Sequence, residues 1–251
     1  MTEELIYHRP NAVTGWEAAF CPGCGHGLVA KVVAEALDDM NLQADAIFIG
    51  GVGCHGMCGG IIDVDWISAL HGRAPAVAAG IKRGLGGKGL VVTLQGDGDL
   101  AAIGLGDILS AVNRGEKLTT IFFNNADYGT TGGQMAPTTL VGQITTTTPN
   151  GRDPEQTGYP VHMAELMASM RGVAYAARCA LNNLKNYLQA KKAVKTAFQK
   201  QLDGVGYSFV EMLSACPAGW NKSPAQALNW LEGSMMKEYS LGEFKNIEKT
   251  S

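Results

Sequence analysis

The spacing of Asp97 and Asn125 could bring a carboxylate and an amide onto one metal ion. Asp97 lies in the tetrapeptide Gly-Asp-Gly-Asp, Asn125 lies 28 positions further on, and each follows an apolar run. Their side-chain oxygens are ligands of the kind that Mg²⁺ takes, and the ion would neutralise a diphosphate. Gly96 and Gly98 would let the backbone approach the diphosphate, and a helix starting near Asp99 would offer free N–H groups. The alternative is a Gly-Asp turn followed by an unrelated Asn turn.

The cysteines form a second candidate site. Cys21 and Cys24 have the CxxC spacing that directs two thiolates to one small ion or cluster. Cys54 and Cys58 would complete a structural zinc site, whereas Cys54 and Cys216 would complete a four-sulfur site for a [4Fe–4S] cluster. The residue pattern leaves both ligand sets open.

Two histidines and an arginine are the candidates for contact with an anion. His55 and His71 lie in glycine-rich segments, where an imidazole could donate to a diphosphate or a substrate carboxylate or could orient a neighbouring group. The fork of Arg73 matches a carboxylate or phosphate, although it could instead pair with an acid of a partner subunit. Residues 51–56 also match the GxGxxG pattern of a nucleotide-binding protein, but the acidic residue expected about 20 positions later is missing.

Buried parallel strands are expected to position these residues. Apolar runs predict strands at 46–50, 89–95, 118–124, 172–180 and 207–214, the fourth of which contains Cys179 as a buried small side chain. Helices are expected at 28–40, 71–86, 100–115, 163–171 and 186–201. This alternation predicts an α/β fold with a doubly wound, mainly parallel sheet, whose ligands lie at the carboxyl ends of strands. The aperiodic stretch 128–160 is expected to be a functional loop.

Composition narrows the class of protein. The chain has 251 residues, of which 46% are hydrophobic and 17% charged, with 33 glycines and a net charge of −3. It can bury a full core, and the absence of a basic field argues against nucleic-acid binding. No apolar stretch is long enough for a membrane span, and residues 1–10 lack a signal-peptide core, so we expect a cytoplasmic protein with reduced cysteines. We expect residues 1–224 to form the α/β domain with its N-terminal cysteine segment, and 225–251 to be an extension packed on a partner or on the domain surface.

The ordered motifs resemble one family. CPGCGHG at 21–27, GVGC at 51–54, HGRA at 71–74, GDGD at 96–99 and YGTTGGQ at 128–134 together resemble the beta subunit of the 2-oxoacid:ferredoxin oxidoreductases. The likeness covers residues 16 to about 224 and includes the GDG…NN motif of thiamine diphosphate enzymes. It implies a thiamine diphosphate-binding α/β domain.

The resemblance also implies ligands. Mg²⁺ would be held by the side chains of Asp97 and Asn125 and by the carbonyl of Asp127. The [4Fe–4S] cluster would be held by Cys21, Cys24, Cys54 and Cys216. Contacts to the organic cofactor are expected from Gly53, Cys54, His55, Gly96, Asp97, Gly98, Asp99, Asn125, Tyr128, Thr130 and Thr131. Candidate catalytic residues are His55, His71 and Arg73. Thr130 departs from the family pattern, in which Met or Asn is frequent.

The activity implied is coenzyme A-dependent oxidative decarboxylation of a 2-oxoacid, with single electrons passing through the cluster to ferredoxin. The segments GVGCHG and LSACPAGW favour 2-ketoisovalerate, with 2-oxoglutarate and pyruvate as alternatives. The family places a required glutamate on the pyrimidine-binding domain of an alpha subunit, and gamma and ferredoxin-like delta subunits are also expected. A non-redox thiamine diphosphate lyase subunit with structural zinc is the rival hypothesis.

Overall fold

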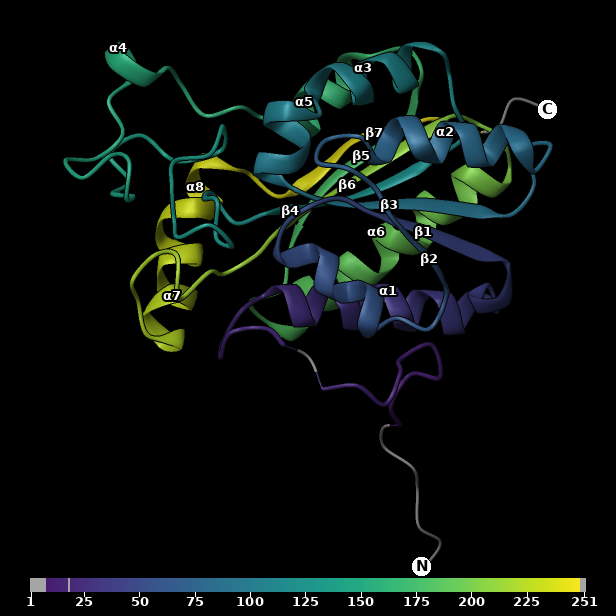
Figure 1. Ribbon diagram of the computed structural model, residues 1–251, viewed down its shortest axis with the longest axis horizontal. Helices are drawn as coiled ribbons and strands as arrows, with labels where there is room; N and C mark the ends of the chain where they lie inside the picture. Colours follow the sequence, from purple (N-terminus) through teal and green to yellow (C-terminus); the bar gives the residue numbers. More distant parts are fainter. Residues whose placement is uncertain (1–7, 18, 249–251) are drawn as a thin grey trace, which may run out of the picture.

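A twisted sheet of parallel strands forms the centre of the molecule (Figure 1). The computed structural model describes residues 8–17 and 19–248, and within them the strand order is β2-β1-β3-β4-β6-β5-β7. The strands are β1 (Ala46–Gly50), β2 (Asp65–Ser68), β3 (Leu90–Gly96), β4 (Thr119–Asn124), β5 (Val173–Ala180), β6 (Tyr207–Leu213) and β7 (Gly242–Asn246). β7 pairs antiparallel with β5, and the other neighbours pair in parallel. The expected mainly parallel α/β sheet is therefore confirmed.

Helices cover both faces of this sheet (Figure 1). Helices α1 (His26–Met40) and α6 (Leu184–Leu202) pack on one face, and α2 (Ala74–Gly84), α3 (Leu105–Asn113) and α5 (Met163–Ser169) pack on the other. Side chains alternate along each strand, so Val92 and Leu94 of β3 join the core under α1 and α6, while Val91 joins the core under α2 and α3. Burial on both faces explains why the central strands β1, β3, β4, β5 and β6 are mostly apolar.

The expected helix at 100–115 is divided in two. A π-helix, η3, runs from Gly98 to Ile103, and α3 begins after Gly104. A Cβ at Gly104 would lie 2.6 Å from the Asp99 carbonyl oxygen and 2.9 Å from that of Gly72. The chain therefore changes helical geometry where two backbones touch, which periodicity alone does not reveal. Short 3₁₀ segments also occur at η1 (Gln43–Asp45) and η2 (Cys54–Gly60).

The C-terminal segment packs on this chain's own sheet and loops. It forms α7 (Pro224–Trp230), η4 (Leu231–Met235), α8 (Met236–Glu238) and then β7. A small apolar core joins Leu231, Met235 and Tyr239 to Ala126 and Leu213 near the strand ends. Figure 1 shows this segment in yellow beside the teal loop.

The guanidinium group of Arg152 ties together several backbone groups of an extended arm, residues 137–160. Arg152 is 4% exposed and is the hydrogen-bond donor to five backbone carbonyls. Those carbonyls belong to Pro137, Thr139, Thr157, Gly158 and Tyr159. One helical turn, α4 (Pro154–Thr157), is the regular structure of the arm. Arg152 thus satisfies backbone groups that a sheet or helix would otherwise satisfy.

None of the helices in the described part of the chain combines the length and the apolar character that crossing a membrane requires.

Candidate functional site

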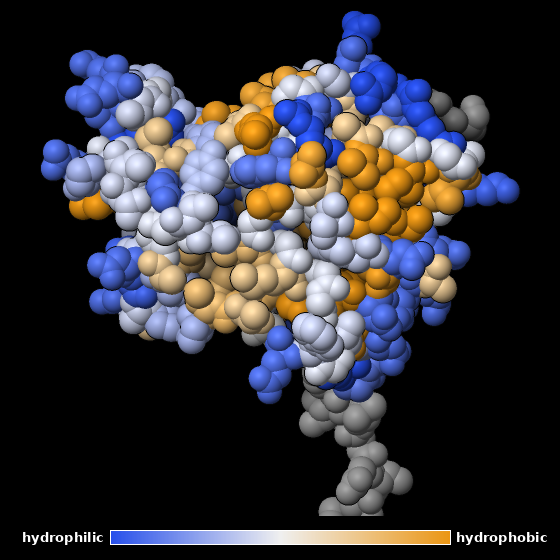
Figure 2. Space-filling view, in the orientation of Figure 1, coloured by the Kyte–Doolittle hydropathy of each residue, from blue (hydrophilic) through white to orange (hydrophobic). Residues whose placement is uncertain are grey.

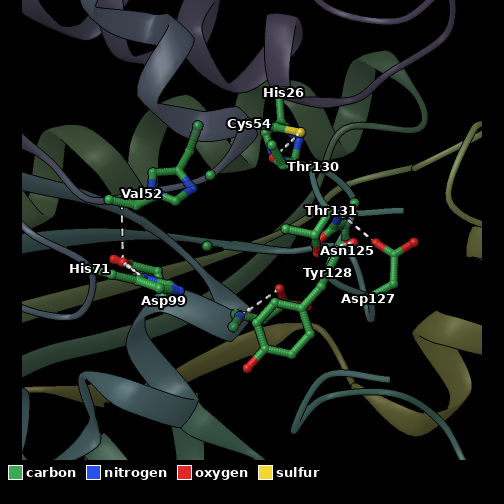
Figure 3. Close-up of a pocket in the computed structure, with 16 residues that line it drawn as sticks. His26, Val52, Cys54, His71, Asp99, Asn125, Asp127, Tyr128, Thr130 and Thr131 are labelled. Atoms are coloured by element: carbon green, nitrogen blue, oxygen red, sulfur yellow. Dashed lines mark hydrogen bonds and ion pairs between the residues drawn. The ribbon is translucent and has the colours of Figure 1, made fainter. Parts of the chain in front are cut away.

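A cavity of about 150 Å³ opens where β1, β3 and β4 end (Figure 3). It is lined by His26, Val52, Gly53, Cys54, His55, His71, Gly96, Asp97, Gly98, Asp99, Asn125, Asp127, Tyr128, Gly129, Thr130 and Thr131. Every residue expected to contact the organic cofactor or Mg²⁺ is in this set. The parallel strands bring these segments together because their carboxyl ends share one edge of the sheet.

Asp97 and Asp127 are buried carboxyl groups in this cavity. Asp97 accepts hydrogen bonds from the Thr138 hydroxyl at 2.6 Å and the Gly98 N–H at 2.9 Å. Burial raises the pKa of Asp97 to about 7. Asp127 accepts from the amide of Asn125 at 2.7 Å, and burial together with the charge of Asp97 raises its pKa to about 8. Two acids therefore share a desolvated space.

The donor set of this cavity fits a hard divalent cation. Among the residues that the structure describes, no lysine or arginine lines it, so Asp97 and Asp127 lack a lysine or arginine partner there. Within the described residues, no N–H or hydroxyl group donates to the buried Oδ2 of Asp127. Carboxylate and amide oxygens are the ligands that Mg²⁺ prefers. As the side chains lie, no three His, Cys, Asp or Glu residues of the described chain are gathered tightly enough to hold a metal ion. The ion would have to draw its ligands together.

The two raised pKa values predict how stability changes with pH. Both carboxyls have folded-state pKa values above the ordinary aspartate value of 3.8, so their contribution to stability is present at low pH and is lost as pH rises to about 7 and 8. Between pH 6.5 and 8 we expect the free energy of unfolding of the cofactor-free chain to fall by about 2 kcal/mol. Urea unfolding at several pH values measures this fall.

A matched variant separates these acids from other groups. The buried His26 and His55 have lowered pKa values and are neutral in the folded chain, whereas the unfolded chain protonates them around and below pH 6.5. They therefore oppose the trend most below pH 6.5 and only weakly toward pH 8. Asp127→Asn should remove more than half of the fall. A flat or rising free energy of unfolding in the unsubstituted chain would contradict the assignment of these pKa shifts.

Asp99 connects three segments around the cavity. Its carboxylate accepts hydrogen bonds from the N–H groups of Val52 at 3.1 Å and Gly72 at 2.8 Å, and from the amide of Gln95 at 2.6 Å. The His71 ring also bonds to it. The sequence placed Asp99 at a helix start, where an acid interacts only with the helix dipole. In the structure, the Asp99 carboxylate also holds the loops that follow β1 and β2, through its bonds to Val52 and Gly72 (Figure 3).

The three candidate catalytic side chains, those of His55, His71 and Arg73, differ in burial and in their position relative to the cavity. His55 is 2% exposed, and burial lowers its pKa to about 4, so the ring is neutral at physiological pH. His71 lies at the cavity with its side chain 39% exposed and is oriented by Asp99. Arg73 pairs with Asp107 and does not line the cavity. Arg73 therefore lies apart from His55 and His71, and its anion-binding role stays a prediction.

His26 lines the cavity, although its sequence position carried no signal of this. It is 3% exposed, its Nδ1 lies 2.8 Å from the Ser214 hydroxyl, and burial lowers its pKa to about 3. Its ring packs against Phe123 of β4. The clue available in the sequence was its place two residues after Cys24 of the CxxC, where a helix begins. Val52 and Gly129 were also missed, because they carry no chemistry of their own.

Four cysteines surround a second, smaller cavity of about 50 Å³. They are Cys21, Cys24, Cys54 and Cys216. Cys58 does not line this cavity and is fully buried in the core under α1. Burial, together with the nearby Cys54 and Cys21, raises the pKa of Cys24 to about 11. Four soft sulfur donors around one space fit an iron–sulfur cluster, and the position of Cys58 does not favour the zinc set that includes it.

The two cavities share a wall. His26, Cys54, Asn125 and Gly129 line both. Figure 3 shows Cys54 beside His26 and Thr130 on one side of the larger cavity. A group bound in one cavity would therefore lie next to a group bound in the other.

Comparison with known proteins places this geometry in context. Residues 51–212 match the family model described as thiamine pyrophosphate enzyme, C-terminal TPP binding domain. The chain is 42% identical over 241 residues to ketoisovalerate oxidoreductase subunit VorA of Methanothermobacter thermautotrophicus, covering 96% of this chain and 50% of that protein. The chain thus spans about half the length of that relative.

A second relative and a solved structure match more of their own length. The chain is 35% identical to 2-oxoglutarate synthase subunit KorB of Methanocaldococcus jannaschii, covering 92% of this chain and 88% of that protein. The fold matches a chain of 2-oxoglutarate:ferredoxin oxidoreductase from Magnetococcus marinus, solved with 2-oxoglutarate, coenzyme A and succinyl-CoA bound, with a TM-score of 0.76. That match has 22% identity and covers 99% of this chain and 88% of the other.

Proposed function

The chain belongs to the 2-oxoacid:ferredoxin oxidoreductase family, and from this we propose that it is the subunit that binds thiamine diphosphate and Mg²⁺ and carries a [4Fe–4S] cluster. One observation carries the proposal: the residues expected to hold the organic cofactor line one cavity, and the four expected cluster cysteines line the cavity beside it.

The larger cavity would take the diphosphate half of the cofactor. Asp97, Asn125 and the carbonyl of Asp127 would hold Mg²⁺, in keeping with two buried acids that lack a cationic partner there. A Cβ at Gly98 would lie 2.0 Å from the ring of Tyr128, so the glycine is needed for this ring to cover the cavity.

The chain's own side chains would orient the reaction and exclude water. Bound thiamine diphosphate supplies a carbanion that attacks the 2-keto carbon and accepts the electrons left when CO₂ departs. His55 is neutral and buried, so it can donate or accept one hydrogen bond without bringing a charge into the cavity. His71 is held by Asp99 near solvent, where its free ring nitrogen can meet an incoming carboxylate.

The cysteine cavity would hold the electron acceptor. A [4Fe–4S] cluster supplies one-electron steps, and Cys21, Cys24, Cys54 and Cys216 would be its ligands. Because Cys54 lies on the wall shared by both cavities, the cluster would lie beside the organic cofactor. Electrons would then leave through the cluster to a ferredoxin.

For the substrate we propose a 2-oxoacid, with 2-ketoisovalerate favoured over 2-oxoglutarate or pyruvate and with coenzyme A as co-substrate. The support is the higher identity to the ketoisovalerate relative, 42% against 35% for the 2-oxoglutarate relative. We also propose an alpha subunit with a pyrimidine-binding domain, a gamma subunit and a ferredoxin-like delta subunit as partners.

Apolar surface supports the need for partners. Figure 2 shows hydrophobic residues gathered over the region of α2 and its neighbouring strands. Large exposed apolar side chains in this part of the chain include Ile67, Leu70, Leu85 and Ile103, with Leu70 80% exposed. Exposed apolar patches are typical of protein–protein interfaces.

The proposal predicts that this chain alone does not oxidise 2-oxoacids. No glutamate lines the larger cavity in the described residues, so the glutamate that the family uses to activate the aminopyrimidine would come from a partner. An anaerobic assay with coenzyme A and a viologen dye should show no turnover by the purified chain and turnover once the partner subunits are added. With the complete complex, 2-ketoisovalerate should give a higher kcat/KM than 2-oxoglutarate.

Turnover by the chain purified without partners would contradict the proposed division of the site. A higher kcat/KM with 2-oxoglutarate would contradict only the proposed substrate.

A further inference from the structure

We propose that the Thr130 hydroxyl donates a hydrogen bond to the Cys54 sulfur and thereby raises the reduction potential of the cluster. The inference rests on the proposed function, in which Cys54 is a cluster ligand. The Thr130 Oγ1 lies 2.9 Å from the Cys54 Sγ, and this contact is drawn in Figure 3. It joins two segments that are 76 positions apart in the chain.

The direction of the hydrogen bond follows from the chemistry of the ligand. A thiol and a hydroxyl can each donate, but an iron-bound cysteine is a thiolate without a proton. In the loaded protein the hydroxyl of Thr130 must therefore be the donor. Among the described residues, the Thr130 hydroxyl forms its hydrogen bond with Cys54.

The loop that carries Thr130 is held in place independently of this contact. Tyr128 and Gln134 form a β-bridge, and the Tyr128 N–H donates to the Gln134 carbonyl at 3.0 Å. The Gly133 N–H donates back to the Tyr128 carbonyl at 2.9 Å. These bonds close the loop and direct Thr130 toward η2, where Cys54 is the first residue.

A hydrogen bond to a cluster ligand favours the reduced cluster. When one electron enters, negative charge on the iron and sulfur atoms increases, and no bond has to form or break. The dipole of a hydroxyl aimed at the sulfur stabilises that added charge more than it stabilises the oxidised cluster. Removing the donor should therefore shift the midpoint potential to a more negative value.

Valine is the matched substitution, because Thr130→Val keeps the shape of the side chain and removes the hydroxyl. The full chain, purified anaerobically, would be titrated with dithionite while the reduced cluster is followed by electron paramagnetic resonance. We expect a more negative midpoint potential in Thr130→Val and in Thr130→Ala, and the unsubstituted value in Thr130→Ser. Thr131→Val is the control, since the Thr131 hydroxyl donates to Gln134 Oε1 at 2.6 Å and should not affect the potential.

Iron analysis of the same samples distinguishes failure of the role proposed for Thr130 from failure of the proposed function. If the unsubstituted chain contains a cluster and Thr130→Val and Thr130→Ala leave its potential unchanged, the role of Thr130 is overturned and the proposed function stands. If the unsubstituted chain binds no cluster, both are overturned. A negative shift in all variants, including Thr130→Ser and Thr131→Val, would show a general loosening of the loop and would also overturn the role.

Discussion

Asp97→Ala is expected to abolish binding of thiamine diphosphate and Mg²⁺. The variant would lose a direct ligand of the metal ion. Replacing a residue that only hydrogen-bonds to a metal ligand already weakens metal binding by about 10–100-fold. We therefore expect a loss greater than about 100-fold in affinity. Isothermal titration calorimetry of the assembled complex measures it. The Thr138 hydroxyl, which bonds to Asp97 at 2.6 Å, would also lose its acceptor.

Asp107→Ala is the matched control for this experiment. It removes an acid of the same type that pairs with Arg73 outside the cavity. Binding should stay as in the unsubstituted complex, because Asp107 contacts neither the metal nor the diphosphate in the proposed site. Equal affinities of the Asp97→Ala and unsubstituted complexes would exclude Asp97 as a metal ligand.

Cys216→Ser is expected to lose the cluster, whereas Cys58→Ala should retain it. Cys216 follows β6 and lines the same cavity as Cys21, Cys24 and Cys54. Cys58 is fully buried and does not line that cavity. Iron and sulfide content of anaerobically purified protein, together with absorbance near about 400 nm that bleaches on reduction, measures the outcome.

Cys179→Ser is the control that shows whether replacing any buried cysteine lowers the iron content. Cys179 lies in β5, 7% exposed, and does not line the cysteine cavity. It should retain full iron content. If Cys58→Ala loses iron and Cys216→Ser retains it, the fourth ligand is Cys58 and not Cys216. If the protein contains zinc in place of iron, the rival lyase hypothesis is supported.

The strands that position the site were predictable because they are buried on both faces. β1 was predicted with its observed bounds, and β3, β4 and β6 were predicted to within one residue at each end. β2 and β7 were not predicted because they are short edge strands. Many of their positions are exposed and polar, so their sequences show no apolar run. Their pairing is decided by the neighbouring strand.

The motifs indicated which residues meet at the cavity, but not the contacts among them. The position of Asp97 and Asn125 at strand ends follows from local sequence and one rule of sheet topology. The four contacts of Asp99 come from three different segments, and the pairing of Arg73 with Asp107 depends on how α2 and α3 pack. Such long-range contacts are set by tertiary structure, for which spacing in the sequence gives no signal.

The contact of the C-terminal segment with the proposed metal site has a consequence for biosynthesis. The Tyr239 hydroxyl donates to the Thr138 carbonyl at 2.6 Å, and the Thr138 hydroxyl donates to Asp97 at 2.6 Å. Tyr239 leaves the ribosome more than 100 residues after both groups. A nascent chain can therefore pair its central strands while Thr138 still lacks this support. Cofactor loading would then be a late event that follows synthesis of Tyr239 and its segment.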